Sequence, residues 1–325
     1  MLIRPELQML RSDDAPQRTA QRAVVSALHV WRTKGDGAEV EAELARFHRG
    51  AALEDLPLMR ALFDPDCTRA NRFLGDLIMP LLHQIAKEPL AQSPLRHSTS
   101  DVSTAIVVAR CATSALTLHC TSGTGLSRQP EAETASFFPA ETWERVLAGS
   151  AEATQVRLAQ VRPDSADLEH VTIRLGEGDV RHRNGRDEAL LVRSVPTKLV
   201  QLRLQRRTDT LQPVRQYRLA DGALVHQAAG TPRDSRLELT AALLGRMKRR
   251  DAAPMLAAMA EERGSDGLRW QVLRECLALN TATGFGTLAT IADRADDSLR
   301  QPAMALRATL IAMHPELQEL VSCPV

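Results

Sequence analysis

The spacing of apolar residues changes twice along this chain of 325 residues, and that change limits the folds open to it. In the first part, apolar side chains recur every three or four residues, as on one face of an α-helix. In the middle they alternate with polar side chains, as on one face of a β-strand, and later the helical spacing returns. The pattern predicts an α+β protein with a helical N-terminal region over residues 1–95, an antiparallel β domain over 96–232 and an α-helical repeat region over 233–325.

The clearest helix of the first region has apolar residues at the spacing i, i+3, i+4, i+7, i+8 and i+11. They are Leu74, Leu77, Ile78, Leu81, Leu82 and Ile85. Pro80 lies within this run and is expected to kink the helix, because proline cannot donate the backbone hydrogen bond of a helix interior. The stripe is most simply part of the core, although Leu77, Leu81 and Ile85 would also serve as the seam of a homodimer formed through the N-terminal helices.

Short alternating runs separated by tight-turn signals fill the middle region, with no helical pattern between them. In the clearest run, Val200, Leu202 and Leu204 alternate with polar residues. Asn184-Gly185 is a hairpin signal, because both central residues of the favoured turn need a positive φ. Antiparallel strands joined in this way form a β-sandwich or a barrel.

The last region repeats itself. Asp266-Gly-Leu-Arg269 and Asp297-Ser-Leu-Arg300 each open a run of apolar residues at helical spacing. Over about residues 236–320 this pattern resembles HEAT-type helical repeats. The resemblance implies stacked helical hairpins, whose concave face commonly binds proteins. Because no set of residues forms a catalytic motif, we predict a non-enzymatic protein-binding or regulatory scaffold, with a protein partner on the C-terminal helical stack.

Composition narrows the function classes. Hydrophobic residues make up 44% and charged residues 25% of the chain, which is ordinary for a globular protein. The formal net charge of +1 argues against a general attraction to nucleic acid or to an acidic membrane. No apolar run reaches the ~18 residues of a membrane span, and the start of the sequence has no signal-peptide pattern. Five widely spaced cysteines predict neither a disulfide framework nor a structural zinc site, so a cytoplasmic location is expected.

One group of histidines and acids in the middle region suggests a metal site. Its members are His170, His182, Glu188 and His226. With this group, the strands weakly resemble a cupin-type barrel, a family that binds a divalent metal inside the barrel through histidines and a glutamate. The resemblance implies these four residues as metal ligands and a divalent metal as cofactor. Asn184 stands where the family has the second histidine of a His-x-His pair, which removes one ligand.

The alternative function that follows is a cupin-like metal-dependent enzyme or a small-molecule sensor centred in the β domain. The opposing interpretation is that the histidines are ordinary surface residues or core residues with satisfied hydrogen bonds. His119 and Cys120 form no thiol–base pair in this scheme, because neighbouring strand residues point to opposite faces.

Basic residues are concentrated between Arg181 and Arg218, where ten positive side chains accompany three acids. Arg203 is expected to point away from the apolar face of its strand, which predicts an exposed basic surface for an anionic ligand. The candidate anion-binding residues are Arg181, Arg183, Arg203, Arg206 and Arg207. The alternative is that these arginines pair with acids of the N-terminal helices, such as Glu39, Glu41 and Glu43. Tyr217 is the one aromatic residue of this segment, which argues against stacking on single-stranded nucleic acid.

Overall fold

The computed structural model describes residues 13–207 and 212–318. The first twelve residues of the predicted helical region, Asp209 of the basic segment and the end of the predicted repeat region lie outside the described residues. The chain divides into two compact units. The first comprises Met1–Ala135, Ala140–Thr208 and Arg218–Gly222, and the second Ser136–Pro139, Asp209–Tyr217 and Ala223–Val325.

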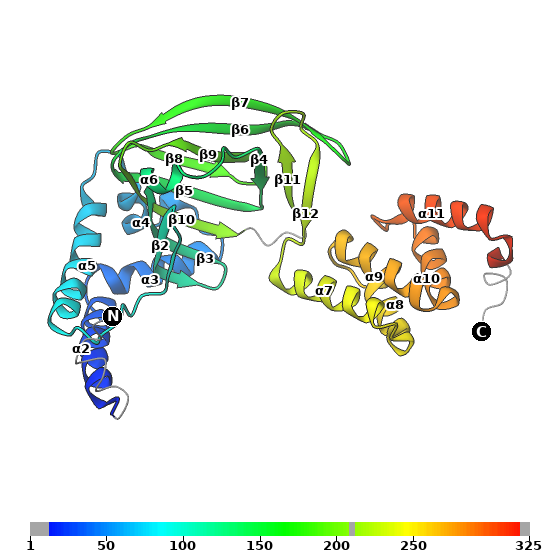
Figure 1. The fold of residues 1–325 in the computed structure, drawn as a ribbon, viewed down its shortest axis with the longest axis horizontal. Helices are drawn as coiled ribbons and strands as arrows, with labels where there is room; N and C mark the ends of the chain where they lie inside the picture. Colours follow the sequence, from blue (N-terminus) through cyan, green and yellow to red (C-terminus); the bar gives the residue numbers. More distant parts are fainter. Residues whose placement is uncertain (1–12, 208–211, 319–325) are drawn as a thin grey trace. The chain divides into compact units, whose positions relative to one another are not determined.

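The predicted α+β class is confirmed, with helices towards both ends of the described chain and antiparallel strands between them (Figure 1). In the first unit, a group of helices precedes the sheets. They are α2 (Ala15–Thr33), α3 (Asp36–His48), η1 (Leu53–Asp55), α4 (Pro57–Leu62) and α5 (Arg69–Lys87). Half of the predicted stripe on α5 is buried, namely Leu74, Leu77 and Leu81, while Leu82 is exposed. The helix runs through Pro80 without interruption.

Two antiparallel sheets make up most of the rest of the first unit. The six-stranded sheet has the order β1-β2-β3-β10-β5-β8, and a three-stranded sheet has the order β7-β6-β9. The first contains β1 (His97–Thr99), β2 (Ser103–Cys111), β3 (Ser114–Ser122), β10 (Lys198–Arg207), β5 (Ala140–Ala148) and β8 (Val180–Asn184). The second contains β7 (Ala166–Leu175), β6 (Ala151–Val161) and β9 (Glu188–Ser194). A short helix, α6 (Gly123–Leu126), follows β3 and is capped by the Ser122 side chain, which accepts a hydrogen bond from Gly125 N.

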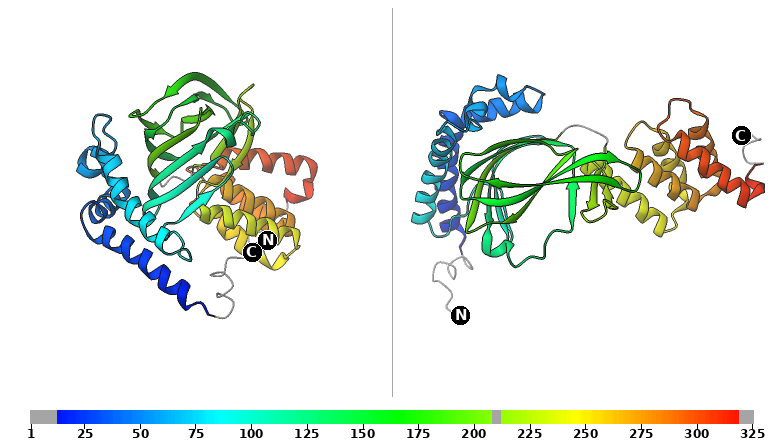
Figure 2. Two further views of the ribbon diagram at one scale, coloured as in Figure 1. Left: turned by 60° about the vertical axis from the view of Figure 1, so that its left-hand side comes forward. Right: turned by 90° about the horizontal axis from the view of Figure 1, so that it is seen from above.

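The N-terminal helices cover one face of the six-stranded sheet (Figure 2). Phe47 of α3 and Phe73 of α5 share one apolar core with Leu116 of β3 and with Leu202 and Leu204 of β10. All five side chains are fully buried. The N-terminal helices therefore pack against the apolar face of β10 that the alternation predicted.

Helices dominate the second unit. They are α7 (Pro232–Arg246), η2 (Arg250–Ala252), α8 (Ala253–Glu261), α9 (Asp266–Leu279), α10 (Thr281–Asp293), α11 (Arg300–Met313) and η3 (Pro315–Gln318). Their common core includes Leu256, Leu273, Cys276, Phe285 and Leu288. A small sheet in the order β12-β11-β4 is formed by β4 (Thr134–Phe137), β11 (Val214–Arg218) and β12 (Leu224–Ala228).

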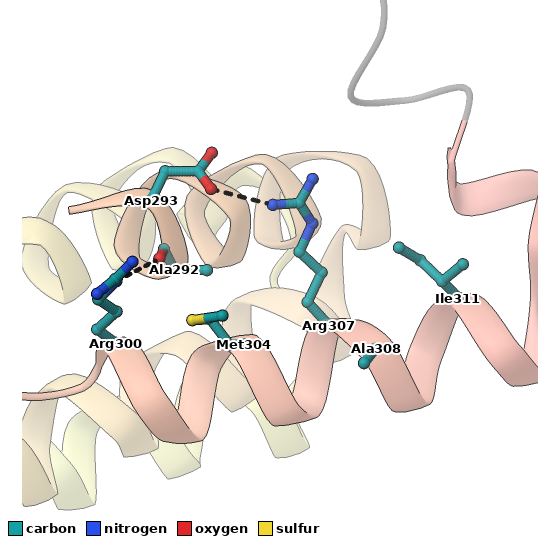
Figure 3. A pocket seen from close by; sticks show the side chains of 7 residues that line it. All are labelled: Ala292, Asp293, Arg300, Met304, Arg307, Ala308 and Ile311. Carbon is teal, nitrogen blue, oxygen red and sulfur yellow. Dashed lines mark hydrogen bonds and ion pairs between the residues drawn. The ribbon is translucent and has the colours of Figure 1, made fainter. Parts of the chain in front are cut away.

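The two arginines of the repeated sequence motif make similar contacts. Arg269 Nε donates to Ala260 O over 2.9 Å. Arg300 Nε donates to Ala292 O over 3.4 Å, and Figure 3 shows this second contact. Each carbonyl lies near the C-terminal end of the preceding helix, where backbone acceptors lack intrahelical donors. The shared contact explains why both motifs carry arginine at this position, while the HEAT-type assignment stays a prediction. Among the described residues, no helix has an apolar stretch long enough to cross a membrane.

Candidate functional site

The face of the six-stranded sheet turned away from the helices is unusually polar. Arg203 of β10 lies opposite Glu144 of β5 and, on its other side, opposite Thr117 of β3. Gln201 lies opposite His119 in the same register. Since strand residues alternate between faces, these side chains lie on the face opposite Leu202 and Leu204. Inner faces of sandwiches are normally apolar, so this polar inner face marks the candidate site.

Glu144 is the centre of the polar inner face. Its side chain is only 4% exposed, and one carboxylate oxygen lies 2.6 Å from Arg203 Nη2 and 3.4 Å from Arg183 Nη2. Burial alone would raise the pKa of Glu144, but the guanidinium groups of Arg203 and Arg183 outweigh burial and hold that pKa below its usual value. Glu144 is therefore an ionised carboxylate with two cationic partners.

His119 is the neutral member of this polar face. Burial and the positive charge of Arg203 lower its pKa from 6.5 to about 4, against the opposing effect of Glu144. Its Nε2 lies 2.9 Å from the Thr117 hydroxyl, which lies two residues away on the same face of β3. At neutral pH the His119 imidazole is thus uncharged and hydrogen-bonded to Thr117.

A cavity of about 310 Å³ lies between the two sheets of the first unit, beside Glu144. Its wall combines charged residues with a smaller apolar part. The six-stranded sheet contributes Glu144, Val180, Arg181, His182 and Arg183, and the three-stranded sheet contributes Gln155, Arg157, Ile173, Glu188 and Leu190. Glu188 Oε1 accepts a hydrogen bond from Arg157 Nε over 2.8 Å, so the second acid of the cavity also has an arginine partner.

Arg181 is the cation of this cavity that lacks a counter-ion. It lies directly opposite Glu144 in the pairing of β8 with β5. Its Nε is buried without a hydrogen-bond partner, and within residues 13–207 and 212–318 its guanidinium forms no ion pair. The Nε atoms of Arg183 and Arg203 are also buried and unpartnered. Buried donors are normally satisfied, so the cavity offers more hydrogen-bond donors than its own acids use.

The predicted exposed basic surface is wrong for Arg203. Its side chain does lie opposite the apolar face of β10, but it is only 28% exposed and is paired with the buried Glu144. The reason is that alternation separates the two faces of a strand without saying which one meets water. Three of the candidate anion-binding residues, Arg181, Arg183 and Arg203, belong to the polar inner face.

Arg206 and Arg207 lie elsewhere on β10. Arg206 pairs with Glu141, donates to Phe47 O and Ala51 O, and stacks over the Phe47 ring at 4.4 Å. It therefore joins the end of α3 to the sheet. Arg207 ends the strand and does not line the cavity.

The alternative prediction was that these arginines form ion pairs within the chain. Three of them do, but the predicted acids were wrong. Arg183 and Arg203 pair with Glu144, and Arg206 pairs with Glu141, so the acids come from β5 and not from the helices. Glu43 instead accepts hydrogen bonds from Leu58 N and Met59 N at the start of α4.

The four candidate metal ligands lie in different surroundings and do not form one group. His170 is exposed on β7, His182 stacks on Trp143 with ring centroids 4.3 Å apart, and Glu188 pairs with Arg157. His226 lies on β12 of the second unit. Across the described parts of the chain, no group of three or more His, Cys, Asp or Glu side chains could hold a metal ion. The ligand set that the cupin resemblance implied is therefore not assembled by these residues, and we derive no step through a metal.

Comparisons with known proteins give a fold likeness only over part of the chain. No protein family model and no curated protein matches the sequence. The similar solved structures include the 7S globulin of Momordica charantia, with 16% identity over 39% of this chain and 36% of that chain and a TM-score of 0.27. They also include a cupin superfamily protein of Desulfitobacterium hafniense DCB-2, with 12% identity over 34% of this chain and 83% of that chain and a TM-score of 0.24.

A third similar structure is the CENP-C cupin domain of Drosophila melanogaster, with 10% identity over 35% of this chain and 76% of that chain and a TM-score of 0.26. Two of these neighbours are thus described as cupin proteins. This chain spans about a third of the length of the globulin (36%). The function has to be argued from the cavity itself.

Proposed function

We propose that the first unit binds a small organic anion, with a carboxylate as the recognised group, in the cavity between its two sheets. This is the sensor form of the alternative predicted from the sequence. The observation that carries it is Arg181, a cation at the cavity wall that forms no ion pair with any described acid. No residue of the site is assigned a catalytic role.

The size and the charge of the cavity support the same ligand class. A volume of about 310 Å³ is at the lower end of small-molecule pockets, so a compact metabolite fits better than a nucleotide or a peptide. The lining holds three arginines and two glutamates, and both glutamates already have arginine partners. A bound anion would balance the remaining positive charge.

Arginine also sets the geometry of recognition. Its planar guanidinium presents parallel N–H donors that match the two oxygens of a carboxylate. Arg183, next but one to Arg181 on β8, has its own unpartnered Nε and lies on the same face of the strand. A carboxylate held by Arg181 would therefore meet a second guanidinium close by, with Ile173 and Leu190 available to its apolar part.

The test uses the purified full-length protein and a panel of monocarboxylates, dicarboxylates and inorganic phosphate in isothermal titration calorimetry. Replacing Arg181→Gln should weaken the best carboxylate by about 10- to 100-fold, since a hydrogen bond to a charged group contributes roughly 1.5–3 kcal/mol. Arg174→Gln is the matched control, because Arg174 on β7 is 87% exposed and outside the cavity lining. Equal affinities in the two variants, or no carboxylate binding at millimolar concentration, would contradict the proposal.

A second candidate function is protein binding by the helical second unit, the leading prediction from the sequence. One observation favours it. Leu239, Leu243 and Met247 are large apolar residues at helical spacing on α7 and at its end, and all three are exposed. Contiguous apolar surface of this kind is typical of an interaction site.

A further inference from the structure

The outer face of α7 carries a short apolar stripe. Leu239 is 73% exposed, and Leu243 and Met247 are each 56% exposed. Residues four apart lie on the same face of a helix, so the three side chains follow one line over roughly 12 Å. The stripe plays no part in holding α7 in the second unit, because Ala241 and Leu237 make that contact on the other side.

Positive charge borders the stripe at the C-terminal end of α7. Arg246, Lys248 and Arg250 are all exposed, and in the described residues their side chains have no hydrogen bond or ion pair. Arg249 differs, because it pairs with Asp251 over 2.7 Å. Cations at a helix C-terminus stabilise the helix dipole, which accounts for some of this charge but not for the exposed apolar residues beside it.

Acids are missing from the outer face of α7. The two acids of the helix are Asp234, which is buried, and Glu238, which is half-buried. Burial and the nearby Asp234 raise the pKa of Glu238. The surface is therefore apolar along its middle and basic at one end.

We propose that this surface binds an acidic amphipathic helix of a partner protein. The inference rests on the second candidate function and gives its partner a chemical class. A stripe one helix wide fits the ridge of a second helix, whose apolar residues at i, i+3 or i+4 would cover Leu239, Leu243 and Met247. Aspartate or glutamate beside that ridge would pair with Arg246, Lys248 and Arg250. A second copy of this chain is a poor occupant, because two basic ends would meet in a symmetric contact.

The experiment measures binding of two labelled helical peptides to the full-length protein by fluorescence anisotropy. Both peptides carry the same leucine stripe, and one has glutamate beside the stripe where the other has lysine. We expect the glutamate peptide to bind with a Kd on the order of 10 µM, as for a small interface, and the lysine peptide at least about tenfold more weakly. Vesicles of phosphatidylcholine with and without phosphatidylserine test the membrane as occupant.

Two double variants separate the apolar from the charged contribution. Leu239→Ser with Leu243→Ser should weaken the glutamate peptide at least about tenfold, and Arg246→Glu with Arg250→Glu should abolish the preference between peptides. Leu82→Ser on α5 is the control, because Leu82 is also exposed but lies in the first unit.

Three other outcomes would contradict the proposal that α7 binds an acidic helix. Equal binding of both peptides that depends on Leu239 and Leu243 would overturn the acidic partner and leave protein binding by α7 standing. Absence of binding by either peptide would overturn both ideas. Binding to the anionic vesicles alone, lost in the Arg246→Glu and Arg250→Glu variant, would assign the surface to a membrane instead.

Discussion

Each unit of this protein buries an arginine–carboxylate cluster, and the two clusters differ in balance. In the second unit, Arg269 pairs with Asp297 over 2.5 Å, and their side chains are only 7% and 6% exposed. Arg269 also donates to Ala260 O, and Asp297 accepts from Leu299 N. In the first unit, Glu144 faces three arginines, all of which have a buried Nε without a partner.

The difference separates a structural pair from a candidate binding site. In the second unit Arg269 has acidic partners in both Asp297 and Asp266, and its hydrogen bond to Ala260 O fixes the start of α9 against α8. A cluster with more cations than anions is an inefficient way to stabilise a fold, because unpaired buried donors cost free energy. Such an excess is explained if a ligand supplies the missing negative charge.

The largest effect on stability is expected for the balanced pair. Arg269→Met should lower the free energy of unfolding by about 3–5 kcal/mol, because it leaves the buried Asp297 carboxylate without the cation that donates a hydrogen bond to it. Chemical denaturation of the full-length protein, followed by circular dichroism, measures this loss. The double variant Arg269→Met with Asp297→Asn should recover part of it. A single variant as stable as the parent protein would show that this pair contributes no more than a surface ion pair.

Removing the acid at the centre of the polar inner face should have a smaller effect on stability and a different effect on binding. Glu144→Gln should lower the free energy of unfolding by about 2–3 kcal/mol, because Arg203 and Arg183 lose their charged acceptor. Carboxylate binding, measured by calorimetry, should be retained or strengthened, since the net positive charge of the cavity increases. Loss of binding in a variant that remains folded would mean that Glu144 itself contacts the ligand, and the comparison between the two clusters would then fail.

The smallest effect is a pH dependence between pH 7 and 5, which we expect from His119 of the first cluster. Because the pKa of His119 is about 4 in the folded protein and 6.5 is its ordinary value, the unfolded chain binds more protons between these limits. The free energy of unfolding should therefore fall as pH drops from 7 to 5, by about 1–2 kcal/mol after allowance for partial exposure to solvent. His119→Gln should remove this part of the pH dependence. An unchanged slope in that variant would place the effect on other groups.

Much of the fold could be predicted from the sequence because local periodicity reports burial on one face. The helical spacing located α5, whose predicted apolar residues Leu77 and Leu81 are buried. It also located the helical run after Arg269, in which Leu273 and Cys276 of α9 are buried. The alternation of β10 likewise identified the side that packs on the helices. Periodicity is a property of residues close together in the sequence, so it can be recognised without knowing how the rest of the chain folds.

The candidate site could be predicted only in part. Arg181 and Arg183 stood out through the density of basic residues, but Glu144 and the role of His119 were missed. A signal for Glu144 existed in β5, where Thr142, Glu144 and Val146 are spaced two residues apart and therefore share one face. Two polar residues on the same face as an apolar one indicate a polar patch on a buried face. Its partners come from β8 and β10, far along the chain, so their meeting could not be anticipated from spacing.

By itself the sequence determined which residues of each strand or helix share a face, because this depends on the 2-residue and 3.6-residue periods of the backbone. Only the tertiary structure decided which face would be covered and by what. The sheet formed by β7, β6 and β9 encloses the side of β5 and β8 that carries Glu144 and Arg181, with the cavity between them. That enclosure turns a set of polar strand residues into a buried charged site, because the energy of a charge depends on its surroundings and not on its place in the chain.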